Sequence, residues 1–380
     1  PLVADHGATL SSDEISAAIR VPLEDETMGK IGHNIKYDIH ALRQLGIDLK
    51  PIVFDTMVAA YILHAHRRSF DFDTVCQREL GYTPITYSAV AGSKKKDASL
   101  LRADGAKVAE YAAEDAVLTY RLYEYFAQQL AKEPELKRVA KEIDFPLIHV
   151  LAAMETRGVC LDPKVLKQLE KDLNKEISLL RARIESHAKE PININSPAQL
   201  QKLLFEELGL AKAGIKTTQN GLSTAAHELE KLQGLHPVID DVLRYRELTK
   251  LMSTYIKTLP KLADKDGRIH TQFSQTTAAT GRLASNNPNL QNIPIRTELG
   301  GKIRTAFVAP KGYELISLDY SQIELRIIAH LAGDKPLQQV FIDGRDVHDE
   351  VAKKLGLDRR AAKAINFGVI YGLSAFGLSK

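Results

Sequence analysis

The sequence has no run of about 18 apolar residues, the length that an α-helix needs to cross a membrane. It contains only two cysteines, Cys76 and Cys160, far apart in the 380-residue chain. Two distant cysteines fit a reducing cytosol and exclude a disulfide framework. The chain also has no internal repeat and no low-complexity linker. We therefore expect a cytoplasmic protein without membrane spans.

The N-terminal residues Pro-Leu-Val-Ala-Asp-His include neither an initiator methionine nor a basic-then-apolar signal pattern. The sequence therefore reads as an internal part of a longer protein. Its length and its 44 % hydrophobic content predict two or three domains. The net charge of only +3 does not by itself indicate nucleic-acid binding, because metal-binding carboxylates offset part of a basic surface.

Residues 1–131 are typical of an α/β domain. A strand-like run, Ile52–Asp55, lies between helical patterns at 38–46 and 55–64, and a long helix is expected at 105–131. From about residue 144 the chain becomes strongly helical. Helices are predicted after Asp162-Pro163, from Ser196-Pro197 to 208, and at 237–259, with a polar, basic loop at 211–224. Strands return at 269–273, 303–308 and before Asp319, and 335–380 is again helical.

The most informative stretch is 313–334, YELISLDYSQIELRIIAHLAGD. A short apolar run ends at Asp319, and Glu324 follows as an amphipathic pattern begins. This predicts a buried strand that delivers a carboxylate to the mouth of a site, followed by a helix. A carboxylate there can hold Mg²⁺, which takes carboxylate oxygens and substrate phosphates.

A second signal comes from Arg359, Lys363, Phe367 and Tyr371, which are spaced by four. Each step of four turns about 40° around a helix, so two cations and two rings share one face. Cations suit a triphosphate, and rings suit a base and a sugar. An ordinary core face is the commoner fate of such rings, but two cations on the same face fit it poorly.

Both segments, together with Thr280-Gly281-Arg282-Leu283 and Asn289-Leu290-Gln291-Asn292-Ile293-Pro294, resemble the family A DNA polymerases. The resemblance covers nearly the whole chain. It implies an α/β multi-domain fold: an incomplete ribonuclease H-like exonuclease domain, then a right-hand polymerase fold with thumb, part of the palm and part of the fingers. The implied domains are 1–131 for the exonuclease, 132–267 for the thumb and connecting helices, 268–334 for the palm and 335–380 for the fingers.

The resemblance implies roles for residues of the polymerase site. Asp319 ligates both catalytic metals, and Glu324 leaves no room for a ribose 2′-hydroxyl. Arg359 and Lys363 bind the triphosphate, Lys363 as part of the catalytic machinery. Further contacts to nucleotide or DNA are implied for Phe367 (sugar), Tyr371 (template base), His348 (phosphate), Gln322 and Arg296 (same pocket), Arg282 (minor groove at the primer end), and Lys212 and Lys216 (duplex phosphates).

Two more strings, GHNIKYD at 32–38 and YAAED at 111–115, resemble motifs of the proofreading 3′→5′ exonuclease. The resemblance makes Asp38 and Asp115 metal ligands, with Tyr111 orienting the attacking water. Tyr111 and Asp115 are four apart and share a helix face.

The sequence departs from the family in three places. The first exonuclease motif, Asp-x-Glu, is absent from residues 1–30, and the segment between His348 and Arg359 is short. The palm segment with a second metal-binding aspartate does not occur before Lys380. We therefore expect the chain alone not to polymerise efficiently.

The predicted function is template-directed DNA polymerisation with 3′→5′ proofreading, in DNA replication and repair. Two Mg²⁺ per active site are expected, replaceable by Mn²⁺. The expected partners are primer–template DNA and deoxynucleoside triphosphates, and we expect a monomer associated with the bacterial nucleoid, a phage or organellar origin being the alternative. A non-catalytic DNA-binding scaffold and a free-standing ribonuclease are the competing hypotheses. The intact site residues argue against the scaffold, and the polymerase strings argue against the ribonuclease.

Overall fold

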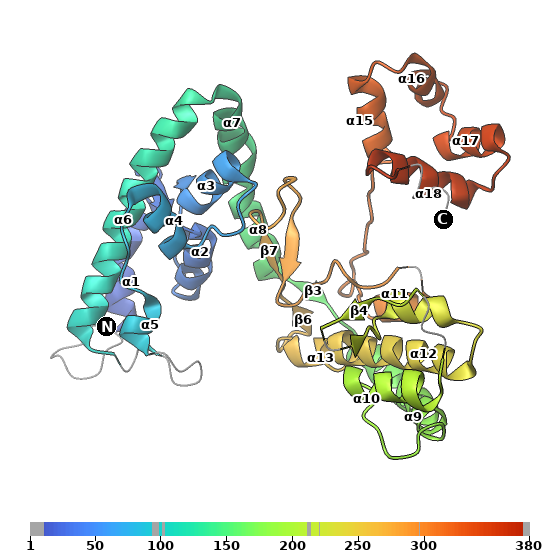
Figure 1. The fold of residues 1–380 in the computed structure, drawn as a ribbon. Coiled ribbons are helices and arrows are strands. Elements are labelled where there is room, and N and C mark those ends of the chain that lie inside the picture. Colours follow the sequence, from blue (N-terminus) through green and yellow to red (C-terminus); the bar gives the residue numbers. More distant parts are fainter. Residues whose placement is uncertain are drawn as a thin grey trace. The chain divides into compact units, whose positions relative to one another are not determined.

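The computed structural model describes residues 11–92, 99–100, 103–210, 214–219, 221–295 and 297–374 (Figure 1). The chain separates into two compact units, Pro1–Tyr313 and Glu314–Lys380, each with its own packing. Within the described ranges, no helix is both long enough and apolar enough to cross a membrane.

The larger unit begins with an α/β part, blue to green-blue in Figure 1. Strands β1 (Lys30–Gly32) and β2 (Ile52–Asp55) pair in parallel. The predicted strand at 52–55 and the predicted helices near 38–46, 55–64 and 105–131 are confirmed. The helices of this part are α1 (Ser12–Glu24), α2 (Ile35–Gln44), α3 (Thr56–His64), α4 (Phe72–Leu80), α5 (Tyr87–Ala91) and α6 (Gly105–Lys132).

Asp55, the last residue of β2, joins the starts of two helices. Its side chain is 1 % exposed and accepts hydrogen bonds from the N–H groups of Met57 (2.8 Å) and Val58 (3.1 Å) in α3. The same carboxylate accepts from the N–H groups of Asn34 (3.3 Å) and Ile35 (2.8 Å) at the start of α2. Because the first N–H groups of a helix have no partner within the helix, a carboxylate there is stabilising. The end of β2 therefore fixes where α2 begins.

The long helix α6 closes the core of this part. Leu118, Leu122 and Phe126 are buried at one-turn spacing and share a core with Ile39 of α2 and Val75 of α4. Asp104 caps the helix, because its side chain accepts from the N–H of Ala106 at 2.8 Å. One face of α6 is thus held against the core. This packing fixes the rotation of the helix and so the direction in which its polar residues point.

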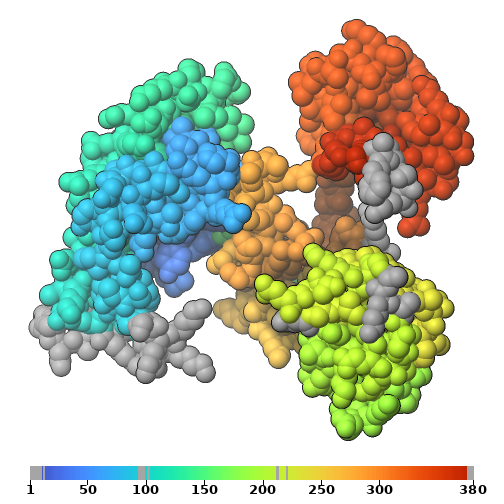
Figure 2. All heavy atoms as spheres, viewed as in Figure 1, coloured from blue at the N-terminus to red at the C-terminus, as the bar shows by residue number. Residues whose placement is uncertain are grey.

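The helical part that follows contains a second core. Asp162 accepts from the N–H of Lys164 at 2.9 Å and Pro163 occupies the first turn, so α9 begins where the sequence predicts. Leu166 and Leu173 of α9 share this core with Tyr245 of α12. Figure 2 shows the side chains from α9 to α12 packed into one body, coloured green to yellow.

The elements of this part are mostly helical. They are α7 (Pro134–Val139), α8 (Phe145–Arg157), α9 (Pro163–Glu185), α10 (Pro197–Gln201), α11 (Ala226–Leu229), α12 (Pro237–Leu251) and α13 (Leu259–Leu262), with π-helical turns at Ala140–Asp144, Lys202–Glu207 and Met252–Ile256 and a 3₁₀ turn at Glu230–Leu232. The predicted basic loop at 211–224 carries a short antiparallel pair, β4 (Thr217–Thr218) and β5 (Gly221–Leu222).

Two further antiparallel pairs complete the larger unit. Strand β3 (Val159–Cys160) pairs with β6 (Arg268–Ile269), and β7 (Gln272–Ser274) pairs with β8 (Ala284–Asn286). The strand predicted at 269–273 is therefore interrupted and belongs to two different pairs. The hairpin formed by β7 and β8 encloses the segment that carries Arg282.

The strand predicted at 303–308 is wrong over its first half, which belongs to helix α14 (Glu298–Arg304). Thr297 caps this helix by accepting from the N–H of Gly300 at 3.1 Å. Leu299 and Ile303, four apart, both point into the core, as a helix requires. Phe307 forms only an isolated bridge to Leu161.

The smaller unit is helical. It contains α15 (Ile323–Leu331), α16 (Lys335–Ile342), α17 (Val347–Leu355) and α18 (Arg359–Ile370). Asp334, Asp346 and Asp358 cap the last three helices. The prediction that 335–380 is helical is confirmed for the described residues up to 370.

The buried strand predicted before Asp319 is wrong for this structure. Residues 313–320 form no strand, and Ile316 and Leu318 are 81 % and 92 % exposed. A strand needs a neighbour for its N–H and C=O groups, and none of the described residues pairs with this segment.

Candidate active sites

The first candidate site is a cavity of about 770 Å³ in the α/β part of the larger unit. The structure brings Asp38, Tyr111 and Asp115 together in its wall, as the sequence predicts. Asp38 lies in the first turn of α2, after Asn34, which adopts the left-handed conformation with φ +57°. Tyr111 and Asp115 lie one turn apart on α6.

Burial changes the acidity of these groups. It raises the pKa of Asp38 to about 6, and the negative charge of Asp55 adds to this effect. Burial also raises the pKa of Asp115, whereas a hydrogen bond with Tyr111 opposes the rise. The pKa of Tyr111 rises to about 12, first because of burial and then because of the nearby Asp115 charge. Tyr111 therefore keeps its proton at neutral pH and acts as a hydrogen-bond donor.

The cavity fits a divalent cation. Oδ1 of Asp115 is buried without a hydrogen-bond partner, and Asp38 lines the same cavity. A cation would supply the missing partner and stabilise the charged form of both acids. Across the described part of the chain, no three potential metal ligands form one cluster.

Several residues of this wall were not predicted from the sequence. Asp73, in the first turn of α4, lines the same cavity, and burial and Asp71 raise its pKa. Asn34 and Tyr87 also line it. Asn34 stands in the GHNIKYD string, so its place beside Asp38 could have been found there. Nothing in the local pattern around Asp73 or Tyr87 indicates this cavity.

The second candidate site lies on the smaller unit and centres on α18. The ring centroids of Phe367 and Tyr371 are 6.5 Å apart with an interplanar angle of 17°. Nζ of Lys363 is 5.9 Å from the Phe367 centroid, and the His348 ring of α17 is 5.6 Å from it. The predicted shared face of α18 is therefore present, with a cation beside two stacked rings.

Glu324 joins this face from α15. Its Oε2 accepts a 2.7 Å hydrogen bond from the hydroxyl of Tyr371. Gln322, which precedes α15, donates from Nε2 to Oδ2 of Asp346 at 3.1 Å. The same Oδ2 accepts from Nη2 of Arg359 at 2.7 Å. Asp346, which the sequence analysis did not single out, is thus the carboxylate that brings Gln322 and Arg359 together.

His348 is 2 % exposed, and its Nδ1 lies 2.9 Å from Nδ2 of Asn366. Because an amide nitrogen can only donate, Nδ1 accepts and carries no proton. Burial lowers the pKa of His348, which favours the neutral ring. The histidine therefore supports α18 by packing and hydrogen bonding in this structure.

The remaining predicted residues lie outside these two groups. Asp319 is exposed in the segment before α15. Arg282 is exposed in the larger unit, within the β7–β8 hairpin, and Lys216 is exposed before β4. Lys212 and Arg296 lie outside the described residues.

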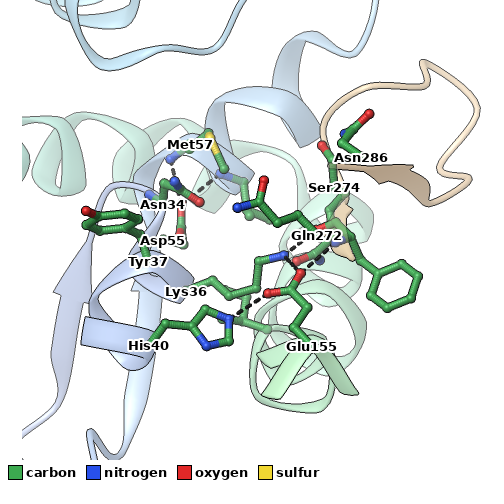
Figure 3. Close-up of a pocket in the computed structure, with 14 residues that line it drawn as sticks. Asn34, Lys36, Tyr37, His40, Asp55, Met57, Glu155, Gln272, Ser274 and Asn286 are labelled. Atoms are coloured by element: carbon green, nitrogen blue, oxygen red, sulfur yellow. Dashed lines mark hydrogen bonds and ion pairs between the residues drawn. The ribbon is translucent and has the colours of Figure 1, made fainter. Parts of the chain in front are cut away.

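A third, smaller cavity of about 180 Å³ lies where α2 and α8 meet the β7–β8 hairpin (Figure 3). Glu155 of α8 is 5 % exposed, and Nζ of Lys36 donates to it and to the carbonyl of Phe273. The N–H of Phe273 donates to Oε1 of Glu155 at 2.6 Å, and Nε2 of His40 lies 2.6 Å from Oε2. No sequence pattern pointed to this junction, because Glu155 lies more than 100 residues from both Lys36 and Phe273.

Comparison with known proteins accounts for the order of these parts. The family model described as DNA polymerase family A matches residues 163–380, and the one described as 3′-5′ exonuclease matches residues 5–131. DNA polymerase I of Chloroflexus aurantiacus is 42 % identical over 380 residues, which cover 97 % of this chain and 40 % of that protein. The thermostable DNA polymerase I of Thermus aquaticus is 49 % identical over 287 residues, covering 73 % and 34 %.

A solved structure is also similar. The POL domain of Pol1 from M. smegmatis, in complex with a DNA primer-template and dNTP, superposes with a TM-score of 0.83 at 35 % identity. The match covers 99 % of this chain and 64 % of that one. The chain spans about 40 % of the length of the first curated relative it matches.

Proposed function

The chain belongs to DNA polymerase family A, and from this premise we propose that it is part of a template-directed DNA polymerase. In that reaction the 3′-hydroxyl oxygen of a primer attacks the α-phosphorus of a deoxynucleoside triphosphate. A new phosphodiester bond forms, and pyrophosphate leaves. The observation that carries the proposal is the α18 face, where Lys363, Phe367 and Tyr371 stand beside Glu324.

Each side chain of this face has a matching task. Lys363 and Arg359 neutralise the triphosphate and the charge that develops on the leaving group. Phe367 packs against the sugar, and Tyr371 lies toward the template base. Glu324 fills the space that a ribose 2′-hydroxyl would need, so selection works by steric exclusion. The hydrogen bond from Tyr371 holds the Glu324 carboxylate in place.

Other residues bind the primer–template DNA. Arg282 contacts the minor-groove edge of the primer end, with Gln322 and Arg296 as further contacts. Lys212 and Lys216 bind duplex phosphates. A role for His348 at a phosphate requires the ring to leave Asn366, its present partner.

We assign 1–131 to a 3′→5′ exonuclease domain, 132–267 to the thumb and connecting helices, 268–334 to the palm and 335–380 to the fingers. The exonuclease-model match ends at residue 131, which supports the first of these limits. The smaller compact unit begins at Glu314, inside the assigned palm.

The first cavity supports the second proposed activity, removal of a mispaired nucleotide from the primer 3′ end. Asp38 and Asp115 face the cavity, and Tyr111 keeps the proton with which it can donate a hydrogen bond to a water. The unpartnered Oδ1 of Asp115 suits a cation. Water attacks the terminal phosphodiester, and a nucleoside monophosphate leaves.

Divalent metal ions serve both families, and we propose Mg²⁺, two per active site, with Mn²⁺ as a substitute. When bound, such ions activate the attacking oxygen and stabilise the leaving one. Asp319 would hold them in the polymerase site, and Asp38 and Asp115 in the exonuclease site. The carboxylate ligands match the preference of Mg²⁺ for oxygen.

The proposed partners are primer–template DNA and deoxynucleoside triphosphates. We propose a monomer that acts in replication and repair at the bacterial nucleoid. Nothing in the comparisons supports a non-catalytic scaffold.

The experiment that tests the proposal separates the two activities in the full-length protein. Primer extension and degradation of a mispaired primer are measured with Mg²⁺ for wild type, Asp115→Ala and a control, Glu110→Ala. Glu110 is exposed on the same helix and does not line the cavity. Asp115→Ala should lose degradation and keep extension, and Glu110→Ala should keep both. Equal loss of both activities in Asp115→Ala, or no extension by wild type, would overturn the assignment.

A further inference from the structure

The hydroxyl of Tyr61, on α3 of the exonuclease-like part, contacts the backbone of the segment that carries Arg282. It donates a hydrogen bond to the carbonyl of Ala278 at 2.6 Å and accepts one from the N–H of Gly281 at 3.0 Å. The two partners are 217 and 220 residues away in sequence. One hydroxyl therefore bridges both ends of the turn 278–281.

The N–H of Gly281 lies 3.3 Å from the carbonyl of Ala278, a long hydrogen bond, and Gly281 has φ +79°. A positive φ is accessible to glycine at little cost, so the backbone here has more conformations to choose from. The two hydrogen bonds of the Tyr61 hydroxyl stabilise one of these conformations. Arg282 directly follows this turn in the sequence.

Tyr61 itself is firmly held. Its residue is 6 % exposed, and its ring packs edge-on against Phe70, with centroids 5.7 Å apart. A buried ring has few rotamers, so the position of its hydroxyl is set by the core of the α/β part. The Tyr61 hydroxyl therefore ties the turn 278–281 to the core of the α/β part.

The start of the same hairpin is held by other residues of the larger unit. Nζ of Lys36 donates to the carbonyl of Phe273 in β7, and Oε1 of Glu155 accepts from the N–H of the same residue. Nε2 of Gln275 donates to the carbonyl and to Oδ1 of Asp144, at 2.9 and 3.0 Å. Residues 273 and 275 are therefore anchored, and the Tyr61 hydroxyl adds two hydrogen bonds at residues 278 and 281 of the same hairpin.

We propose that Tyr61 is a positioning residue for the primer terminus. From the exonuclease-like part, it fixes the turn 278–281 so that Arg282 is aimed at the minor-groove edge of the last primer base pair. The inference rests on the proposed function, specifically on the role of Arg282. Correct binding of the primer end by Arg282 then depends on Tyr61, a side chain of the exonuclease-like part.

The test uses the full-length protein and two primers that differ at one atom. One primer ends in adenine, and the other ends in 3-deazaadenine, which lacks the N3 acceptor that adenine presents in the minor groove. Single-nucleotide insertion rates are measured for wild type, Tyr61→Phe, Arg282→Ala and a control, Tyr125→Phe. Tyr125 also lies on the exonuclease-like part, and its hydroxyl donates to Glu79 at 3.1 Å, away from the hairpin.

Wild type and Tyr125→Phe should insert more slowly on the 3-deazaadenine primer, whereas Arg282→Ala should show no such penalty. Tyr61→Phe should insert roughly five- to tenfold more slowly on the adenine primer, the size of one lost hydrogen bond. Its penalty for 3-deazaadenine should shrink toward that of Arg282→Ala. Its degradation of single-stranded DNA should stay at the wild-type rate, because both hydrogen bonds lie outside the exonuclease cavity.

The ratio of rates on the two primers is independent of how much of each preparation is folded. A Tyr61→Phe variant that is slower on both primers with an unchanged ratio would overturn the positioning role and leave a purely structural one. A variant that behaves like Tyr125→Phe would overturn it too. If wild type shows no penalty for 3-deazaadenine, the proposed role of Arg282 is wrong, and the inference fails with it.

Discussion

The hydroxyl of Tyr371 donates a 2.7 Å hydrogen bond to Oε2 of Glu324, and this bond joins the end of α18 to the start of α15. Both residues were predicted to face the nucleotide, but the sequence did not predict that they touch. A carboxylate that is held by a neighbour loses less rotamer freedom when substrate arrives. A carboxylate held in this way therefore excludes a 2′-hydroxyl more effectively than a side chain that can rotate away.

Glu324→Ala should let ribonucleotides in, because it removes the volume that competes with the 2′-hydroxyl. Tyr371→Phe should have a smaller effect in the same direction, since Glu324 keeps its volume but loses its hydrogen bond. Insertion kinetics with deoxy- and ribonucleotides measure both. We expect discrimination to fall by more than tenfold for Glu324→Ala, about 1.4 kcal/mol or more. Glu350→Ala, which alters an acid paired with Arg345 instead, is the control and should change nothing.

Phe367→Tyr should raise the acceptance of dideoxynucleotides and leave ribonucleotide exclusion unchanged. The Phe367 ring packs between His348 and Tyr371 and has no polar atom, so it offers nothing to a nucleotide that lacks a 3′-hydroxyl. A phenol hydroxyl at this position would supply the missing polar group. Competition between dideoxy- and deoxynucleotides measures the effect, which we expect to be roughly tenfold or more. A variant that altered only ribonucleotide use would contradict the proposed placement of the ring.

Asp319→Ala should abolish nucleotide addition while primer–template binding survives. The carboxylate is proposed to hold metal, whereas phosphate contacts from lysines and arginines supply most of the DNA affinity. Primer extension and fluorescence anisotropy with labelled DNA separate the two effects. Glu314→Ala, an exposed acid in the same segment, is the matched control. A variant that retains more than about a tenth of the wild-type rate, a change below about 1.4 kcal/mol, would mean that Asp319 is not a metal ligand.

Asp38 should make the stability of the exonuclease-like part depend on pH. Its folded pKa of about 6 lies above the ordinary value of 3.8, so the folded state favours the neutral acid. The stabilisation is therefore complete below about pH 3.8 and is lost as the pH rises through 6. In metal-free buffer at pH 7.5, Asp38→Asn should raise the melting temperature by roughly 1–3 °C, and near pH 4 it should not. The effect should be modest because Asp38 is an exposed residue, so solvent screens its charge.

Mg²⁺ supplies the control for this pH prediction. The ion should stabilise wild type at pH 7.5, because it favours the ionised carboxylate, and it should stabilise Asp38→Asn much less. Equal metal-induced shifts for both proteins would contradict the assignment of Asp38 as a ligand. A wild-type melting temperature that does not change relative to Asp38→Asn between pH 4 and 7.5 would contradict the raised pKa.

The parts of the sites that lie within one helix could be predicted from the sequence. The spacing of Lys363, Phe367 and Tyr371 needs only the helical period, and the spacing of Tyr111 and Asp115 needs only one turn of α6. The start of α9 could also be predicted, because the cap at Asp162 and the proline after it are local signals. These features depend on residues a few positions apart.

Features that depend on distant segments were not predictable from one sequence. Asp73 reaches the first cavity because α4 packs on α6, and Glu155 meets Lys36 across 119 residues. The two wrong strand predictions have a related cause. The apolar run before Asp319 has no pairing partner among the described residues, and the run at 303–308 lies partly in a helix whose cap, Thr297, stands upstream.

Arg359 forms ion pairs with two carboxylates of α17 and its cap, Asp346 and Asp349. The guanidinium lies 2.7 Å from Oδ2 of Asp346 and 3.2 Å from Oδ1 of Asp349. A triphosphate that binds Arg359 therefore displaces these carboxylates from the guanidinium. One ion pair replaces another, and few salt ions are released from Arg359 into solution. Since ionic strength weakens the old pair along with the new one, the two effects partly cancel. Nucleotide affinity should therefore fall less steeply with added salt than the number of cations on α18 suggests.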